Sequence, residues 1–324
     1  MRKTAIAITL GDPAGIGPEI TAKALATGKF QLDSIVLVGS RTAFLEAAET
    51  AGLDRSLLAV SSFIDTGAGR IITGKISLEA GKSALLGIEK AAELAIAGKV
   101  EGICTSPINK EAIVLAGSKY IDQSTMLQGL TSSVDVSTVF ETGRLRIIFM
   151  TKHMPLRDAL DHITSESVKK SIRLADLALR YLGSGRRRIA VAALNPHGGE
   201  GGLLGREEKD VIAPAVQEMS SEYNVSGPIP ADTVFHQAAC GAYDIVVSLY
   251  HDQGHIAAKT LDFSGTVSMN IGLPFLRTSV DHGTAFDIAG RGKADATSMV
   301  EAIERCFRYA ASYRDYRNSL EPAG

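Results

Sequence analysis

Apolar, strand-like runs alternate along the chain with segments whose apolar residues have helical spacing. Residues 4–10 and 34–39 are strand-like, and the segments that follow them, residues 18–27 and 41–52, have the helical pattern. A repeated order of strand and helix favours parallel strands in a sheet that is covered by helices. The pattern therefore predicts the α/β fold class with a parallel sheet.

Size and charge narrow the functional classes. With 324 residues and 45% hydrophobic content, the chain is long enough for two domains with large cores. The 34 basic and 36 acidic residues are balanced and form no long block of one sign, so nothing indicates a nucleic acid or a membrane surface as partner. No apolar stretch is long enough to span a bilayer, and the N-terminal segment is typical of a first strand rather than a signal peptide. Three widely spaced cysteines favour a reducing, cytoplasmic setting.

Three histidines stand just past the ends of strand-like runs. They are His153, His197 and His251. Because the carboxyl ends of parallel strands open onto the ligand crevice of an α/β protein, the three imidazoles could converge there. Three neutral imidazoles with one open position are typical of a catalytic divalent-metal site. The alternative for each histidine alone is a structural role.

Two loops near the N-terminus are candidates for anion binding. Residues 11–19 (GDPAGIGPE) combine glycines with Pro18 at a helix start, and the alternative is a tight strand-to-helix turn. Neither standard nucleotide fingerprint is present. In residues 105–111, Lys110 either holds an anionic substrate or lies on a solvated helix start.

Two later loops surround the second and third histidines. Residues 195–205 place five glycines and a carboxylate close to His197, and the alternative is a flexible solvent loop. His251 and His255 are four residues apart, but Gly254 and the preceding strand argue against a helix, so we expect His251 to be a ligand and leave His255 unassigned. Asp252 either orients an imidazole, takes a proton, or caps the next helix.

Residues 268–285 hold the last group of polar side chains. Arg277 offers a planar fork for a carboxylate or phosphate, and Asn270 adds a neutral donor and acceptor. These residues predict one wall of a ligand site. For Arg277 the alternative is a structural ion pair.

Taken together, the motifs GDPAGIGPE, TSPINKEA, NPHGGEGGLLGREE, YHDQG with a later lysine, and NIGLPFLRTSVDHGTA resemble the 4-hydroxythreonine-4-phosphate dehydrogenase (PdxA-like) family. The resemblance runs from Gly11 to about Asp295, with the motifs in the family's order. It implies an isocitrate/isopropylmalate dehydrogenase-like, two-domain α/β/α fold and a homodimer. We expect residues 1–125 plus 276–324 to form one domain and residues 126–275 the other, with the active site in the cleft between them and at the dimer interface.

The resemblance also implies roles for individual residues. His153, His197 and His251 would bind one divalent metal ion, such as zinc, cobalt or magnesium, with ligands drawn from both subunits. The expected substrate-binding residues are Gln123, Ser124, Lys259, Asn270 and Arg277; the catalytic residues are Lys259 and Asp252; and the cofactor-binding residues are Gly283, Thr284 and Ala285. Asp232 matches a further acidic residue that maintains the site.

The implied reaction is the NAD-dependent (or NADP-dependent) oxidation of a secondary alcohol, after which the β-keto acid loses carbon dioxide. A metal ion that lowers the pKa of the alcohol and later polarises the ketone would serve both steps. Arg186, Arg187 and Arg188 either bind a 2′-phosphate or form a solvated strand entrance, so the choice of cofactor stays open.

One segment departs from the family pattern. Where the family has Gly-His-Thr-Glu, this chain has Asp122, Gln123, Ser124 and Thr125, which removes a possible cation and adds a negative charge. The expected substrate is a phosphorylated four-carbon hydroxy acid, either 4-hydroxythreonine 4-phosphate or D-threonate 4-phosphate, and residues 250–261 are closer to the threonate subgroup. The alternatives are an unphosphorylated or aromatic dihydrodiol carboxylate as substrate, a phosphate acyltransferase, and a noncatalytic binding protein. His282, like His255, has no assigned role.

Overall fold

The computed structural model describes residues 4–54, 62–67 and 69–320, and the chain divides into two compact units. Unit 1 is formed by Met1–Val136 and Gly272–Asn318, and unit 2 by Ser137–Ile271. The sequence placed the divisions at residues 125 and 275 instead. Residues 126–136 and 272–275 belong to unit 1 because the side chains of Met126, Leu127, Leu273 and Phe275 are part of its hydrophobic core.

The five strands of unit 1 are parallel, in the order β3-β2-β1-β4-β11. Their bounds are β1 Ile6–Thr9, β2 Ile35–Gly39, β3 Ser62–Asp65, β4 Gly102–Thr105 and β11 Leu276–Val280. The helices are α1 Gly17–Ala26, α2 Arg41–Thr50, α3 Leu78–Ile96, α4 Lys110–Leu115, α5 Gln123–Thr131 and α11 Thr297–Leu320, with a 3-10 turn η1 at Leu32–Ser34.

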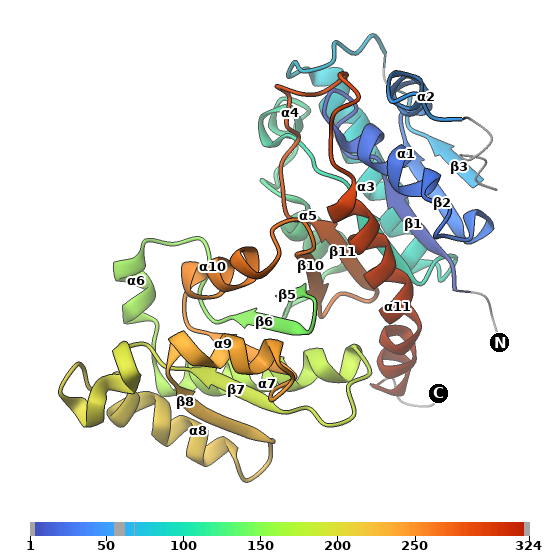
Figure 1. Ribbon diagram of the computed structural model, residues 1–324. Coiled ribbons are helices and arrows are strands. Elements are labelled where there is room, and N and C mark those ends of the chain that lie inside the picture. Colours follow the sequence, from blue (N-terminus) through green and yellow to red (C-terminus); the bar gives the residue numbers. More distant parts are fainter. Residues whose placement is uncertain (1–3, 55–61, 68, 321–324) are drawn as a thin grey trace. The chain divides into compact units, whose positions relative to one another are not determined.

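Helices cover both faces of this sheet, which explains why its central strands β1 and β4 are completely buried. In Figure 1, α1 and α11 lie in front of the strands and α3 lies behind them. On the α3 side, Ile88 packs with Ala7 and Ile103 in one apolar cluster. The α/β prediction is confirmed, and the helix starts and strands expected near the N-terminus are present.

Unit 2 has a mixed sheet, so the prediction of a parallel sheet is wrong for part of it. The strand order is β10-β5-β6-β9-β7-β8, and the pairs β10·β5 and β5·β6 are antiparallel. Only two residues, Gly143 and Arg144, join β5 to β6, and Gly143 has φ +54°. A connection this short can only form a hairpin, because a parallel crossover needs a dozen or more residues.

The strands of unit 2 are β5 Ser137–Thr142, β6 Leu145–Phe149, β7 Ile189–Ala192, β8 Val225–Ile229, β9 Ile245–Ser248 and β10 Val267–Ile271. Its helices are α6 Leu156–Asp161, α7 Ser165–Tyr181, α8 Ala213–Met219, α9 Ala231–Ala239 and α10 His251–Leu261, with short helical turns η3 at Pro196–Gly202 and η4 at Glu208–Ile212. In Figure 1, α9 and α10 lie in front of the strands and α7 lies behind. No helix in the described part of the chain is long and apolar enough to cross a membrane.

The segment after β9 is helical, which overturns the prediction that Gly254 prevents a helix at residues 251–255. A Cβ atom added to Gly254 would stand 2.6 Å from Cε1 of Phe149, 2.9 Å from Cγ2 of Ile147 and 3.0 Å from Oγ of Ser248. Glycine is therefore required for close packing of α10 on β6 and β9, and the packing outweighs its low helix propensity.

Gly254→Ala tests this contact. We expect the substitution to lower the free energy of unfolding by about 1–2 kcal/mol, because the added methyl group overpacks the interface by more than alanine gains in helix propensity. The matched control is Gly87→Ala in α3, where the new Cβ atom would meet its nearest neighbour, the Val38 carbonyl oxygen, at 3.7 Å. Denaturant unfolding of both variants is the measurement, and equal stability of the two would contradict the packing argument.

Candidate active site

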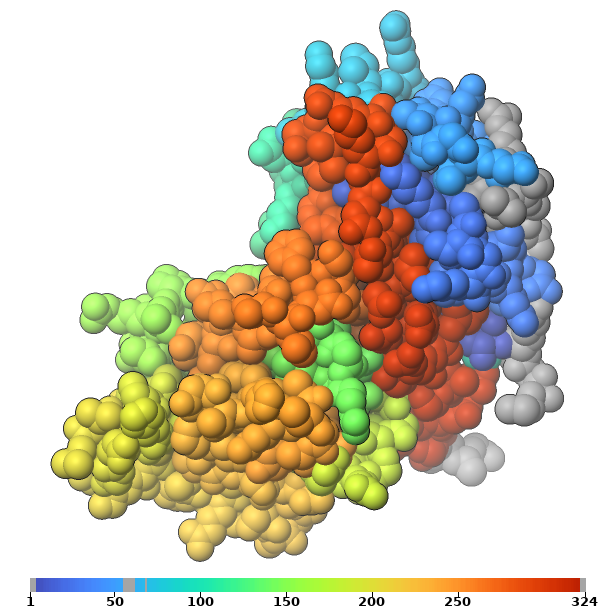
Figure 2. Space-filling view, in the orientation of Figure 1, coloured from blue at the N-terminus to red at the C-terminus, as the bar shows by residue number. Residues whose placement is uncertain are grey.

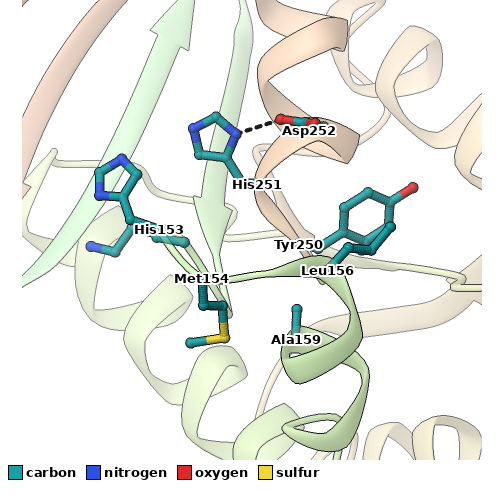
Figure 3. Close-up of a pocket in the computed structure, with 8 residues that line it drawn as sticks. His153, Met154, Leu156, Ala159, Tyr250, His251 and Asp252 are labelled. Carbon is teal, nitrogen blue, oxygen red and sulfur yellow. Dashed lines mark hydrogen bonds and ion pairs between the residues drawn. The ribbon is translucent and has the colours of Figure 1, made fainter.

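Two of the three predicted metal ligands lie together in unit 2. His153 follows β6, and His251 is the first residue of α10, which follows β9. Because β6 and β9 are parallel neighbours, their carboxyl ends bring the two histidines to one edge of the sheet. The ring centroids are 5.5 Å apart, and Figure 3 shows the two rings side by side. They line a pocket of about 240 Å³ together with Lys152, Met154, Leu156, Ala159, Tyr250 and Asp252.

Carboxylates set which ring nitrogen is available on two of the predicted ligands. Nδ1 of His251 lies 2.6 Å from Oδ1 of Asp252, and Nδ1 of His197 lies 2.9 Å from Oε1 of Glu200. A carboxylate accepts a hydrogen bond from the Nδ1–H group of a neutral imidazole, which leaves the Nε2 lone pair for a metal ion. In Figure 3 the other ring nitrogen of His251 is on the side of His153. Asp252 is thus positioned to orient an imidazole, one of the roles predicted for it.

The geometry of His153 and His251 fits two ligands of one ion. Two imidazoles that share a tetrahedral ion, at metal–nitrogen distances of about 2.0–2.1 Å, have ring centres about 5 Å apart. Among the described residues, no three His, Cys, Asp or Glu side chains of one chain are grouped closely enough to hold a metal ion. The structure therefore brings two of the predicted ligands together, and His197 does not join them within this chain.

His197 lies in a glycine-rich turn with an unusual backbone. Residues 197–201 all have φ between +45° and +79°, and the turn is at the surface of unit 2, where Figure 2 shows it in yellow. The neighbouring Glu208 anchors it, accepting hydrogen bonds from the backbone N–H groups of Leu194 and Asn195 and from the Asn195 side chain. Burial alone would raise the pKa of Glu208, but these hydrogen bonds outweigh it and the pKa is lowered. The loop is thus held at its base rather than freely flexible.

Arg277 is the central polar residue of the candidate site in unit 1. It is only 5% exposed, and its Nε and Nη2 atoms donate to Oγ1 of Thr105 at 3.0 and 2.8 Å. Its Nη1 atom donates to Oγ of Ser124 at 3.1 Å. Burial lowers the pKa of Arg277 to about 10, against the opposing effects of Cys104 and Asp122. The guanidinium is therefore still a cation at neutral pH and is suited to binding an anion.

The segment that departs from the family pattern forms the start of α5. Asp122 is the N-cap, and its Oδ1 atom accepts from the backbone N–H of Thr125 at 2.8 Å. Gln123 is buried, and its Nε2 atom donates to the carbonyl oxygen of Ser106 at 3.0 Å, while its Oε1 atom has no hydrogen-bond partner among the described residues. The carboxylate of Asp122 thus caps the helix, and the amide of Gln123 presents an acceptor oxygen.

The remaining predicted substrate residues of unit 2 lie on β10 and α10. Asn270 is buried, and its Nδ2 atom is 3.4 Å from Oγ1 of Thr138, which also accepts from Nζ of Lys152 at 3.1 Å. Lys259 lies two helical turns beyond His251 on α10, with Nζ 5.0 Å from the ring centroid of Phe263. Residues at this spacing share one face of a helix.

The loop at residues 11–19 is completely buried, which favours the tight-turn alternative over an open anion site. A Cβ atom on Gly11 would stand 2.2 Å from the Pro107 carbonyl oxygen, and one on Gly15 would stand 2.9 Å from Cβ of Thr284. The backbone N–H of Ile16 donates to the carbonyl oxygen of Thr284. The predicted cofactor-binding segment Gly283, Thr284 and Ala285 therefore packs on this turn.

The surroundings of two further sets of basic residues, Lys110 and the three consecutive arginines, agree with structural roles. Lys110 is exposed at the first residue of α4, which agrees with a solvated helix start. Arg187 pairs with Asp176 at 2.9 Å and Arg188 with Asp244 at 3.0 Å. These ion pairs account for two of the three consecutive arginines without a cofactor phosphate.

The sequence did not identify three residues that shape the site. Thr105 holds the Arg277 fork, Glu208 anchors the His197 loop, and His255 stacks on His251 with ring centroids 3.6 Å apart. The position of Thr105 at the end of a strand was a usable signal. Glu208 contacts a loop that lies 13 residues away along the chain, which spacing alone does not show, and the stack of His255 on His251 was missed because Gly254 argued against a helix.

Comparisons with known proteins find relatives that resemble this chain in sequence and in fold. A family model described as "Pyridoxal phosphate biosynthetic protein PdxA" matches residues 18–306. A protein of Symbiobacterium thermophilum named "Putative D-threonate 4-phosphate dehydrogenase" is 48% identical over 96% of this chain and 98% of its own length. The structure of 4-hydroxythreonine-4-phosphate dehydrogenase from Klebsiella pneumoniae is 41% identical, with TM-score 0.86 over 95% of this chain and all of that one.

A more distant structure matches nearly the whole chain as well. The terephthalate 1,2-cis-dihydrodiol dehydrogenase of Burkholderia xenovorans is 28% identical, with TM-score 0.65 over 97% of this chain and 99% of that one. The family model covers most of the chain, and the relatives match it almost from end to end. The chain therefore belongs to the PdxA family of 4-hydroxythreonine-4-phosphate and D-threonate 4-phosphate dehydrogenases.

Proposed function

We propose that this dehydrogenase oxidises the secondary alcohol of D-threonate 4-phosphate with NAD, in a reaction that requires a divalent metal ion and ends with loss of carbon dioxide. The pairing of His153 and His251, with Asp252 on Nδ1 of His251, carries this proposal because it leaves two imidazoles able to share an ion. The 48% identity to the Symbiobacterium thermophilum protein supports the choice of substrate. The related 4-hydroxythreonine 4-phosphate is the second candidate, supported by the Klebsiella pneumoniae structure.

The proposed reaction uses two steps. In the first, the alcohol carbon gives a hydride to the nicotinamide and the hydroxyl gives up a proton, so that a β-keto acid and NADH are formed. In the second, the bond to the carboxylate carbon breaks, carbon dioxide leaves, and the remaining carbon is protonated. A divalent ion, when bound, supplies a Lewis acid that lowers the pKa of the alcohol and then polarises the ketone.

This chain's own residues would bind the substrate and move the protons. Lys259, two turns along α10 from His251, would take the hydroxyl proton and return a proton after decarboxylation. Arg277 would hold the anionic end of the substrate with Ser124, and its burial strengthens the interaction by excluding water. Asp252 keeps His251 in the tautomer with Nε2 free.

The dinucleotide is proposed to bind beside Gly283, Thr284 and Ala285. Ala285 has φ +43°, a conformation that costs energy for a residue with a side chain and that clusters at functional sites. Gly283 has no atom within 4 Å of its added Cβ position, so the backbone is open to close approach there. Because Arg187 and Arg188 already have carboxylate partners, NAD fits this chain better than NADP.

A homodimer would complete the metal site. The family resemblance implies that the ligands come from both subunits, and in the described part of the chain His197 does not join His153 and His251. Unit 2 also exposes large apolar side chains on α6, on the His197 loop, and along and just after α10, as expected of a surface that a second subunit covers. These side chains are Leu156, Leu160, Leu203, Leu204, Ile256, Leu261 and Phe263. We propose that His197 of the partner subunit is the third ligand.

The first experiment compares substrates. We expect NAD reduction with D-threonate 4-phosphate to proceed at a higher kcat/KM than with 4-hydroxythreonine 4-phosphate when a divalent metal is added, because the chain is more similar to the D-threonate proteins. A chelator should abolish both rates. The control reactions replace NAD with NADP and the substrate with an aromatic dihydrodiol carboxylate. No NAD reduction with either phosphorylated acid would contradict the proposed function.

The second experiment tests the shared site. His197→Ala and His251→Ala should each lower bound metal to well under one equivalent and remove activity, because each loses one ligand. Mixed dimers of the two variants contain one intact site, so refolding the variants together should restore about a quarter of the wild-type activity. A mixture that stays inactive while it forms dimers would show that both histidines serve the same subunit.

The third experiment tests the departure at α5. Gln123→His combined with Ser124→Thr should raise kcat/KM for 4-hydroxythreonine 4-phosphate by about tenfold, because an imidazolium adds one charge-assisted hydrogen bond to a phosphate. Gln128→His on the same helix is the control and should change nothing. If the double variant gains no activity, the segment does not determine the choice of substrate.

A further inference from the structure

Among the described residues, the ring that lies nearest to the His251 ring is that of His255. The two residues are one turn apart on α10, and their rings lie face to face, with centroids 3.6 Å apart and planes inclined by 13°. The Nδ1 atom of His255 is 3.0 Å from the carbonyl oxygen of His251, and a carbonyl can only accept, so Nδ1 carries the proton. The orientation of the His255 ring is therefore fixed by its own helix.

Two phenylalanine rings of the sheet also lie against the His255 ring. The Phe140 ring of β5 meets it edge-on at 4.4 Å, and the Phe149 ring of β6 lies 4.6 Å away. Gly254 makes these contacts possible, because it lets α10 approach Phe149 closely. His255 is thus held between two phenylalanine rings and His251, and a ring in such a setting has little freedom to change rotamer.

The stacked arrangement is unsuited to joint metal binding by His251 and His255. Imidazoles that share an ion have ring centres about 5 Å apart and nitrogens that converge, whereas face-to-face rings at 3.6 Å keep their nitrogens in nearly parallel planes. The 5.5 Å spacing of His153 and His251 meets the requirement instead. The geometry that suits His251 to bind an ion together with His153 therefore does not suit it to bind the same ion together with His255.

We propose that His255 is a positioning residue, whose ring, stacked on His251 and supported by Phe140 and Phe149, holds the His251 imidazole in the plane needed to bind the metal ion. Asp252 determines which nitrogen of His251 is free, and His255 determines where that nitrogen points. The inference rests on the proposed role of His251 as a metal ligand. It attributes the effect on metal affinity to the stacking of the two rings and not to the charge of His255.

Two substitutions separate stacking from hydrogen bonding. His255→Phe keeps an aromatic ring of similar placement and removes the N–H donor, while His255→Leu removes both. We expect the leucine variant to bind cobalt(II) about 10- to 100-fold more weakly than the wild type, as for loss of other groups that orient metal ligands. The phenylalanine variant should stay within about threefold of the wild type, because the stack is retained. His236→Leu on α9 removes an exposed imidazole of the same unit and is the control.

The measurements are titration of the metal-free dimer with cobalt(II), followed by its visible absorption, and the imidazole ¹H–¹⁵N spectrum of the metal-free protein. In the spectrum His251 should show one tautomer in one environment in the wild type and the phenylalanine variant, and several environments in the leucine variant. Wild-type affinity in the leucine variant, or equal weakening in both variants, would overturn the proposal. Thermal unfolding confirms that each variant is folded.

The two readouts separate this inference from the proposed function. If the wild type binds no cobalt(II), the proposed metal-dependent function fails, and the spectrum still decides whether His255 orients His251. If the wild type binds the metal and the His251 signals of the leucine variant do not change, the positioning role fails while the proposed function stands.

Discussion

The close packing of α10 against β6 is the constraint on which the candidate metal site depends. Gly254 brings the helix within contact of Phe149 and Ile147, and the same contact places His251 beside His153 at the end of the neighbouring strand. Two imidazoles can share an ion only if both are held to within about 0.5 Å of the required geometry. The position of the two histidines is therefore determined by the packing of a helix on a sheet, and not by contacts that the histidines make themselves.

The candidate site residues of the two units lie in opposite electrostatic environments. In unit 2, carboxylates that are themselves solvent-exposed lie against the Nδ1 atoms of His197 and His251 and orient the two imidazoles at little desolvation cost. In unit 1, Arg277 is buried among the hydroxyl groups of Thr105 and Ser124, and its pKa is lowered to about 10. Neutral ligands suit a divalent cation, whereas a dehydrated guanidinium suits an anionic substrate.

The sequence predicted the α/β class and the strand ends that carry His153 and His251, because strand periodicity and the parallel-sheet rule are local signals. It failed where tertiary contacts override local preference. Gly254 lies in a helix because the sheet excludes a side chain there, and β5 and β6 form a hairpin because Gly143 allows a two-residue turn. The stack of His255 on His251 needed that helix, so it too was beyond the reach of residue spacing. Whether His197 joins His153 and His251 was likewise beyond residue spacing, because three strand-end positions do not fix the distances between loops.

The backbone of the glycine-rich turn sets an energetic cost for the two side chains that it carries. His197 and Glu200 have φ +54° and +45°, a left-handed conformation that costs roughly 1–2 kcal/mol per residue with a side chain, while glycine adopts it freely. Glycine at either position would follow the same path with less backbone strain. The turn therefore carries the His197–Glu200 pair, with Nδ1 and Oε1 2.9 Å apart, at a cost that Gly198, Gly199 and Gly201 avoid.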